Sequence, residues 1–180
     1  MVSKMNKPLL ARTAVWLILV GGLVVIATAW GYQLIGGYVP CKLCLEQRVP
    51  YYVGLPLAAI AMFFLTRQKD GLAALALLAV AVVFAYGAGL GAYQAGAEWD
   101  FWAGPNDCGG GNSGPTSAAN MLSALQNTRV VSCTEATWRM LGLSFAGWNA
   151  VASAGLAFLG LAGALLTLGS RKEQSGDQPA

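Results

Sequence analysis

The chain has 180 residues, of which 56% are hydrophobic and only 11% are charged, and its formal net charge is +3. A soluble globular domain usually carries about 25% charged residues, so this composition argues against an ordinary soluble protein. The small excess of basic residues gives no sign of a nucleic-acid-binding surface.

Four apolar segments are each long enough to cross a bilayer as a helix, which needs about 20 residues. A spanning segment must satisfy its own backbone hydrogen bonds, and a helix does this. We therefore expect an all-α membrane protein, a four-transmembrane-helix bundle forming one domain over residues 1–168. The expected spans are residues 13–35, 48–66, 71–93 and 143–168, and the polar tail over 169–180 is expected to be disordered.

Lysine and arginine near the helix ends predict the orientation, because cytoplasmic loops are enriched in both. Seven basic residues gather on one side of the predicted membrane: Lys4, Lys7, Arg12, Arg67, Lys69, Arg171 and Lys172. The other side has four: Lys42, Arg48, Arg129 and Arg139. Both termini are therefore expected in the cytoplasm. All four cysteines then lie on the opposite side, in the compartment where disulfides persist.

The first apolar segment also has features of a secretory signal peptide. Basic residues precede it, and Ala27-Thr28-Ala29 is similar to a cleavage site. However, the apolar run continues through Leu34 and is longer than the hydrophobic region of such a peptide. We expect it to be retained as the first span, which gives the even number of spans that two cytoplasmic termini require.

A Cys-x-x-Cys pair, Cys41 and Cys44, stands directly before the second span. Such a pair can close into a small disulfide, and a helix N-terminus favours its thiolate form. Arg48 follows Cys44 by one helical turn and would place a cation on the same face, where it could also polarise a bound carbonyl. The pattern favours a redox-active thiol pair.

A structural disulfide and half of a zinc site are the alternatives for this pair. So short a loop would constrain little of the unfolded chain. A zinc site would need further ligands, and the chain has no histidine and no second Cys-x-x-Cys.

Residues 94–142 form the one sizeable segment outside the predicted membrane, a long loop that carries Cys108 and Cys133. An apolar stripe predicts a short amphipathic helix over 117–129, lying flat on the outer leaflet or packed on the protein. A disulfide between the two cysteines would close this loop. The glycines at 109–111 would make Cys108 accessible, which favours thiol exchange over a purely structural role.

Two cysteine pairs on the oxidising face of a membrane protein suggest an electron relay. An external dithiol would reduce the loop pair, which would reduce Cys41 and Cys44 in turn. The sequence offers no haem or metal ligand set, so the simplest final acceptor is a quinone dissolved in the bilayer.

Taken together, these features resemble the quinone-linked thiol oxidoreductases of the disulfide bond formation protein B (DsbB) family. The resemblance covers about residues 10–168. It rests on Pro40-Cys41-x-x-Cys44-x-x-Gln47-Arg48, the four spans and the two loop cysteines. Two further segments add to it, Glu-Trp-Asp-Phe-Trp-Ala-Gly-Pro at 98–105 and Leu-Gly-Leu-Ser-Phe-Ala-Gly-Trp-Asn at 141–149.

The resemblance implies an enzyme of the bacterial inner membrane, with its cysteines on the periplasmic side, that supports protein folding in the periplasm. Its partner would be a DsbA-type thioredoxin-like thiol oxidase, and its electron acceptor ubiquinone or menaquinone. In the family's pattern Cys108 forms the mixed disulfide with the partner, with Cys133 as its companion. Cys41 then takes the disulfide between the two pairs, and Cys44 faces the quinone.

The resemblance also implies that Arg48 and Gln94 contact the quinone. Many relatives have histidine at the position of Gln94, near the exit of the third span. Glutamine can hydrogen-bond a carbonyl but supplies no proton near neutral pH, so quinone affinity or pH dependence is expected to differ.

Three other functions fit parts of the pattern. A vitamin K epoxide reductase-like enzyme also combines a helical bundle with Cys-x-x-Cys and quinone chemistry, but its active pair is expected late in the chain. A non-catalytic tetraspan scaffold with a disulfide-stapled loop would tolerate Arg48→Ala. A metal-transport protein would require bound metal and reduced thiols.

Overall fold

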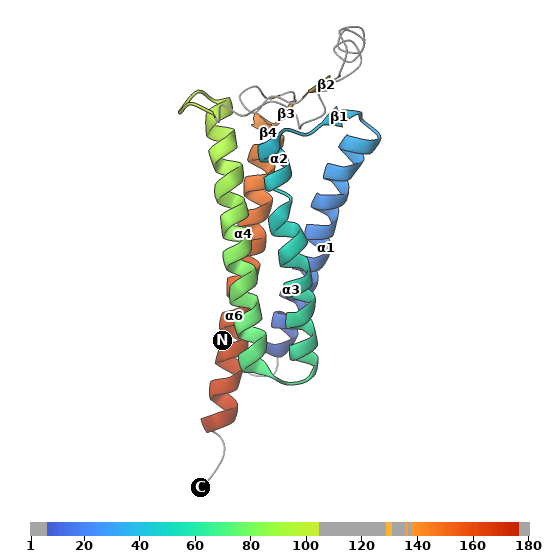
Figure 1. The fold of residues 1–180 in the computed structure, drawn as a ribbon. Helices are drawn as coiled ribbons and strands as arrows, with labels where there is room; N and C mark the ends of the chain where they lie inside the picture. The colour runs from blue at the N-terminus through green and yellow to red at the C-terminus, as the bar shows by residue number, and fades with distance from the viewer. Residues whose placement is uncertain (1–6, 105–128, 131–135, 137, 177–180) are drawn as a thin grey trace.

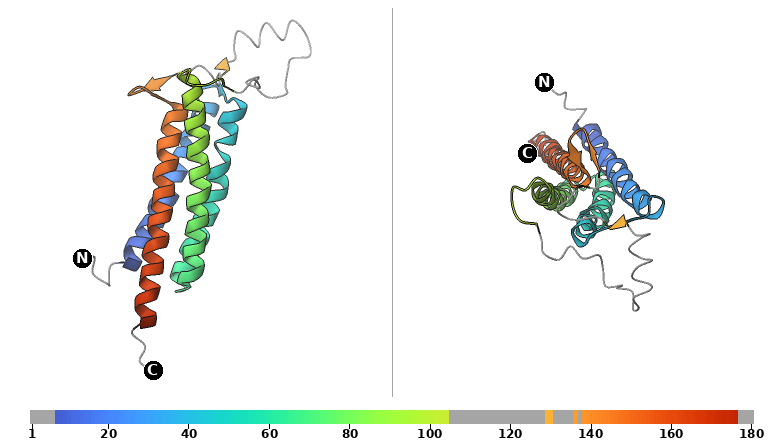
Figure 2. Two further views of the ribbon diagram at one scale, coloured as in Figure 1. Left: turned by 90° about the vertical axis from the view of Figure 1, so that its left-hand side faces the viewer. Right: turned by 90° about the horizontal axis from the view of Figure 1, so that it is seen from above.

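The computed structural model describes residues 7–104, 129–130, 136 and 138–176 of the chain. Four long helices run side by side in an elongated bundle, and the short helix α2 precedes the second of them (Figure 1). Seen along the bundle, the four long helices surround a common axis (Figure 2). The helices are α1 (Lys7–Leu34), α2 (Lys42–Glu46), α3 (Val49–Thr66), α4 (Asp70–Glu98) and α6 (Phe145–Gly176).

The surface of the bundle is apolar along its length, and several alanines are buried along its axis. Ala11, Ala58 and Ala61 are fully buried, whereas large side chains such as Val82 and Phe158 are 69% exposed. In water such a surface would be an extensive hydrophobic patch, but in a bilayer it contacts lipid. The expectation of four membrane-spanning helices is confirmed, because four helices are long and apolar enough to cross a membrane.

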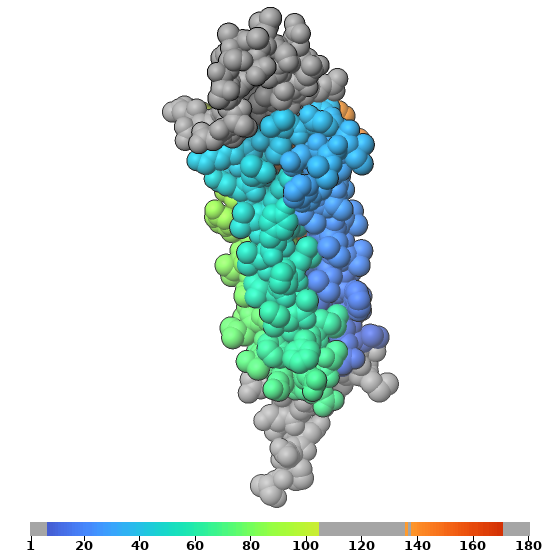
Figure 3. All heavy atoms as spheres, turned by 45° about the vertical axis from the view of Figure 1, so that its right-hand side comes forward, coloured from blue at the N-terminus to red at the C-terminus, as the bar shows by residue number. Residues whose placement is uncertain are grey.

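The helices pack in a definite order around the axis. On the face shown in Figure 3, α3 lies between α1 and α4. On the other side α6 contacts both α4 and α1, which closes the bundle. The core between them includes the fully buried side chains of Val15, Ile18, Leu77, Val80 and Phe84.

Proline separates α2 from α3 and so determines how the Cys-x-x-Cys segment joins the bundle. Pro50 stands in the first turn of α3, a position that needs no backbone N–H donor. In an unbroken helix its ring would clash with the carbonyl of Glu46, which favours an interruption before α3. α2 therefore ends at Glu46, and Arg48 caps α3 instead of occupying the next turn of α2.

Two small β ladders lie at the same end of the bundle as α2 (Figure 1). Strand β1 (Tyr38–Val39) pairs in parallel with β2 (Arg129–Val130), so that Val39 is opposite Val130. Strands β3 (Arg139–Met140) and β4 (Leu143–Ser144) form an antiparallel hairpin. Its two turn residues, Leu141 and Gly142, both have positive φ, as a two-residue hairpin with the right-handed strand twist requires.

The observed elements differ from the predicted ones at several boundaries. α4 continues to Glu98, so residues 94–98, expected in the loop, are helical, and α6 continues to Gly176. The amphipathic helix predicted over 117–129 lies outside the described residues except for its last position, Arg129, which belongs to β2. Most of the long loop likewise lies outside them.

Close packing of α4 on α6 gives a stability prediction. A Cβ added at Gly91 would lie 2.8 Å from the backbone nitrogen of Ala150 and 2.9 Å from the carbonyl oxygen of Ala146. Backbone atoms cannot move aside as a side chain can, so Gly91→Ala is expected to destabilise the bundle by about 1–3 kcal/mol. The loss in free energy of unfolding is measured on the detergent-solubilised protein, with circular dichroism as the probe.

Gly89→Ala is the matched control, because a Cβ at Gly89 of the same helix meets no atom within 4 Å. It should leave stability unchanged or raise it by roughly 0.5–1 kcal/mol through the helix preference of alanine. Equal free energies of unfolding for the two variants would contradict the close contact of α4 with α6.

Candidate active site

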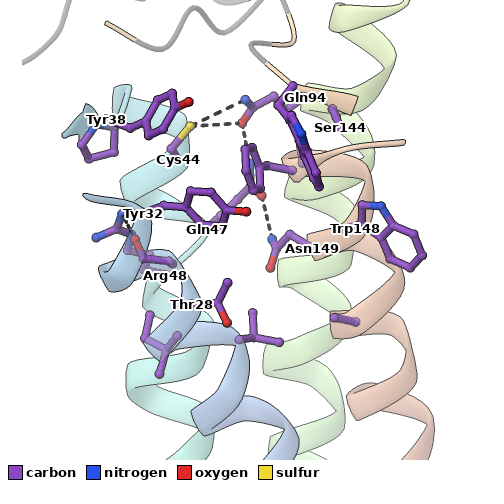
Figure 4. Close-up of a pocket in the computed structure, with 18 of the residues that line it drawn as sticks. Thr28, Tyr32, Tyr38, Cys44, Gln47, Arg48, Gln94, Ser144, Trp148 and Asn149 are labelled. Carbon is purple, nitrogen blue, oxygen red and sulfur yellow. Dashed lines mark hydrogen bonds between the residues drawn. The ribbon is translucent and has the colours of Figure 1, made fainter. Parts of the chain in front are cut away.

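A cavity of about 560 Å³ opens among the helices at the end of the bundle that carries α2 and the strands (Figure 4). Its volume is typical of small-molecule sites in proteins. Most of its lining is apolar and comes largely from α1 and α6, including Val25, Tyr32, Phe145 and Trp148. The polar lining residues include Cys44, Gln47, Arg48, Gln94, Glu98 and Asn149, together with Thr28, Gln33 and Ser144.

The two cysteines of the Cys-x-x-Cys segment have different environments. Cys41 is the N-cap of α2 and is fully buried, and its Sγ accepts a hydrogen bond of 3.2 Å from the backbone nitrogen of Cys44. The Sγ atoms of the two residues lie 2.6 Å apart. Cys44 lines the cavity, whereas Cys41 does not. A small molecule in the cavity therefore meets the Cys44 sulfur, with Cys41 directly behind it.

Gln94 connects the thiol pair to the opposite wall of the cavity. This side chain is only 2% exposed, and its Nε2 lies 3.7 Å from Cys44 Sγ and 3.3 Å from Glu98 Oε1. Its Oε1 accepts a hydrogen bond from Gln47 Nε2. With contacts on both ends of the amide, the orientation of Gln94 is fixed, and Nε2 is presented to the sulfur as a donor that favours the thiolate.

A chain of hydrogen bonds continues from Gln47 into α6 (Figure 4). Asn149 donates from Nδ2 to Gln47 Oε1 at 2.6 Å, and its Oδ1 accepts from the hydroxyl of Tyr51 at 2.7 Å. The same hydroxyl lies 3.0 Å from Ser153 Oγ. Buried polar groups are costly unless paired, so these bonds hold α3, α4 and α6 in one arrangement around the cavity.

Arg48 lies on the wall of the same cavity, but its guanidinium is directed toward α1. Nη1 donates to Gln33 Oε1 at 2.6 Å, Nη2 donates to the carbonyl oxygen of Ala29 at 3.4 Å, and the group stacks 5.4 Å from the ring centre of Trp30. Between Cys44 and Arg48 the helix tightens, because the N–H of Arg48 bonds to the carbonyl oxygen of Leu45 at 3.0 Å, while Gln47 and Arg48 keep helical φ and ψ. The structure brings both residues to one cavity, while Gln94 and Cys41, not Arg48, contact the sulfur of Cys44.

The remaining predicted site residues, Cys108 and Cys133, lie outside the described residues. Sequence reasoning did not predict site roles for Gln47, Asn149 or Glu98. Glu98 was expected in the loop, and only the extension of α4 places it on the cavity. All three stand within segments that carry the family resemblance, Gln47 in 40–48, Glu98 in 98–105 and Asn149 in 141–149, which is the signal that could have identified them.

Comparison with known proteins gives one match. The family model described as disulfide bond formation protein DsbB matches residues 11–163, which include the bundle, the Cys-x-x-Cys segment and the cavity residues. No curated protein and no solved structure matches the chain. Since the match spans most of its length, the chain belongs to the DsbB family and is a membrane oxidoreductase that forms disulfide bonds.

Proposed function

We propose that this protein oxidises a periplasmic DsbA-type dithiol partner and transfers the electrons to membrane quinone. The observation that carries this proposal is the position of the thiol pair: Cys44 lies on the wall of a cavity large enough for a small molecule, in contact with Cys41. A thiol pair in this position can accept electrons from a second cysteine pair through Cys41 and transfer them through Cys44 to a ligand in the cavity.

The cavity residues fit a quinone head group. Apolar side chains such as Val25 and Phe145 would enclose the ring, and the polar groups that could bind its oxygens stand at a few points only. Arg48 and Gln94 are the predicted contacts, and Asn149 of α6 is a third donor that lines the cavity. When bound, quinone accepts two electrons and two protons, the number that oxidation of a dithiol releases.

Cys108 and Cys133 are proposed to exchange with the partner and then with Cys41. The pairing of Val39 with Val130 supports this proposal. It places Val130, which precedes Cys133 by three residues in the sequence, beside the segment that leads into Cys41. The proposed orientation, with both termini in the cytoplasm and the cysteines in the periplasm, follows from the distribution of lysine and arginine.

An anaerobic assay of the purified protein with a reduced DsbA-type partner tests this function. We expect one quinone to be reduced for each partner dithiol oxidised, and parallel assays with ubiquinone and menaquinone identify the preferred acceptor. Cys108→Ser should stop transfer from the partner while leaving quinone reduction by dithiothreitol, which reduces Cys41 and Cys44 directly. Absence of quinone reduction in the wild type, with cysteines that do not react with the partner, would instead favour a stapled scaffold.

A further inference from the structure

Glu98 is a buried carboxyl on the cavity to which the steps above give no role. It is the last residue of α4, one helical turn after Gln94, and is only 9% exposed. Its Oε1 accepts the hydrogen bond from Gln94 Nε2. Its Oε2 is buried and has no hydrogen-bond partner among the residues that the structure describes.

Neighbouring basic groups do not neutralise this carboxyl in the described part of the chain. Arg139 of β3 donates from Nη2 to the backbone oxygen of Glu98 at 3.0 Å, not to its side chain. Arg48 is bonded to Gln33 and Ala29 on α1. A buried carboxyl oxygen without a partner is costly. Because this oxygen belongs to a residue that lines a ligand-sized cavity, we expect it to gain a proton or a hydrogen-bond donor during the reaction.

Oxidation of the dithiol releases protons, and a carboxyl on the cavity wall, such as that of Glu98, could accept them. The other titratable or charged side chains that line the cavity are Cys44 on α2, Arg48 at the start of α3, and Tyr32, Tyr38 and Tyr51 on α1, β1 and α3. The Gln94 amide, which contacts the sulfur, has no proton to exchange near neutral pH. Glu98 is the one carboxyl among the described lining residues.

On the basis of the proposed function, we propose that Glu98 carries protons from the Cys41–Cys44 dithiol to the quinone. Cys44 Sγ lies 3.7 Å and Glu98 Oε1 lies 3.3 Å from the same atom, Gln94 Nε2, and water between the two groups would complete the path for the proton.

The proposed steps balance in electrons and protons. The carboxylate takes the proton of Cys44, so that the S–H bond breaks and an O–H bond forms. That O–H bond breaks as the proton passes to a quinone oxygen, which regenerates the carboxylate. The proton of Cys41 then follows the same path as the Cys41–Cys44 disulfide forms, and the two electrons of that oxidation reduce the quinone to quinol.

Glu98→Gln tests the proposal, because it preserves the size of the side chain and an acceptor for Gln94 but removes the exchangeable proton. In anaerobic single-turnover measurements on the dithiothreitol-reduced protein, we expect quinone reduction to slow about 100-fold at neutral pH, as for loss of a general acid–base group. Glu98→Ala should be slow as well, and added acetate, which can occupy the space left by the shorter side chain, should restore part of its rate. Quinone binding to the oxidised protein, followed by quenching of tryptophan fluorescence, should change little.

Glu46→Gln is the matched control, since it removes the same charge from an exposed carboxyl on α2 and should leave the rate unchanged. A wild-type rate in Glu98→Gln would overturn the proposal. So would a loss of quinone affinity equal to the loss of rate, or a slow Glu98→Ala that acetate does not rescue, because Glu98 would then be a binding or structural residue. If the reduced wild-type protein fails to reduce quinone, the proposed function itself fails and the role of Glu98 falls with it.

Discussion

Cys44→Ser is expected to abolish quinone reduction, with a loss of at least about 10³-fold in single-turnover rate, as for removal of a nucleophile. Cys44 carries the sulfur that lines the cavity, 2.6 Å from the sulfur of Cys41. Serine can neither form the disulfide nor provide a thiolate at neutral pH. The measurement is anaerobic reduction of quinone by protein previously reduced with dithiothreitol and freed of excess reductant.

The reciprocal variant, Cys41→Ser, separates the roles of the two sulfurs. It should also stop turnover, because no Cys41–Cys44 disulfide can form. However, its remaining Cys44 lines the cavity, while the Cys41 that remains in Cys44→Ser is fully buried. A small apolar maleimide should therefore label Cys44 of the Cys41→Ser variant faster than it labels Cys41 of the Cys44→Ser variant. Faster labelling of Cys41 would contradict the assignment of Cys44 as the sulfur that faces the quinone.

Arg48→Ala is expected to raise the KM for quinone about 10- to 100-fold, because a hydrogen bond to a charged group contributes about 1.5–3 kcal/mol. Its contacts with Gln33, Ala29 and Trp30 hold the guanidinium on the cavity wall before any ligand binds. A guanidinium has five N–H donors, so these two hydrogen bonds leave others for a ligand. Steady-state assays with varied quinone and saturating partner give the KM.

Two other variants sharpen this test. Arg48→Lys keeps the charge but loses the planar group that bonds α1 and stacks on Trp30, so an intermediate KM is expected. Arg67→Ala removes an exposed arginine at the opposite end of the bundle and should leave the KM unchanged. A fall in kcat with an unaltered KM in Arg48→Ala would exclude a role for Arg48 in quinone binding.

The sequence alone was enough to predict the membrane-spanning architecture. Apolar segments such as 71–93 have no charged residue and could satisfy their backbone groups in a bilayer only as helices. The family could also be predicted, because the motif around Cys41 and Cys44 is local in the chain and does not depend on packing. The roles predicted for the four cysteines stay predictions.

The face that each helix turns toward the bundle axis could not be predicted, because helices that are apolar all round carry little periodic signal. Large apolar side chains stand on both faces, for Phe84 and Leu77 are buried in the core while Val82 and Phe158 are exposed. Small residues mark the closest contact between helices, such as Gly91 against Ala146 and Ala150.

The cavity itself was decided only by the tertiary structure. Gln47 bonds to Gln94 across 47 residues of sequence and to Asn149 across 102, and no spacing rule connects positions so far apart. The direction of Arg48 depends on a helix break at Pro50 and on Gln33 of another helix. Glu98 lines the cavity because α4 continues beyond its apolar segment. The sequence by itself determined which segments are apolar enough to cross the membrane and where the Cys-x-x-Cys pair stands, since both are local in the chain, whereas the groups that surround Cys44 were decided by how the helices pack.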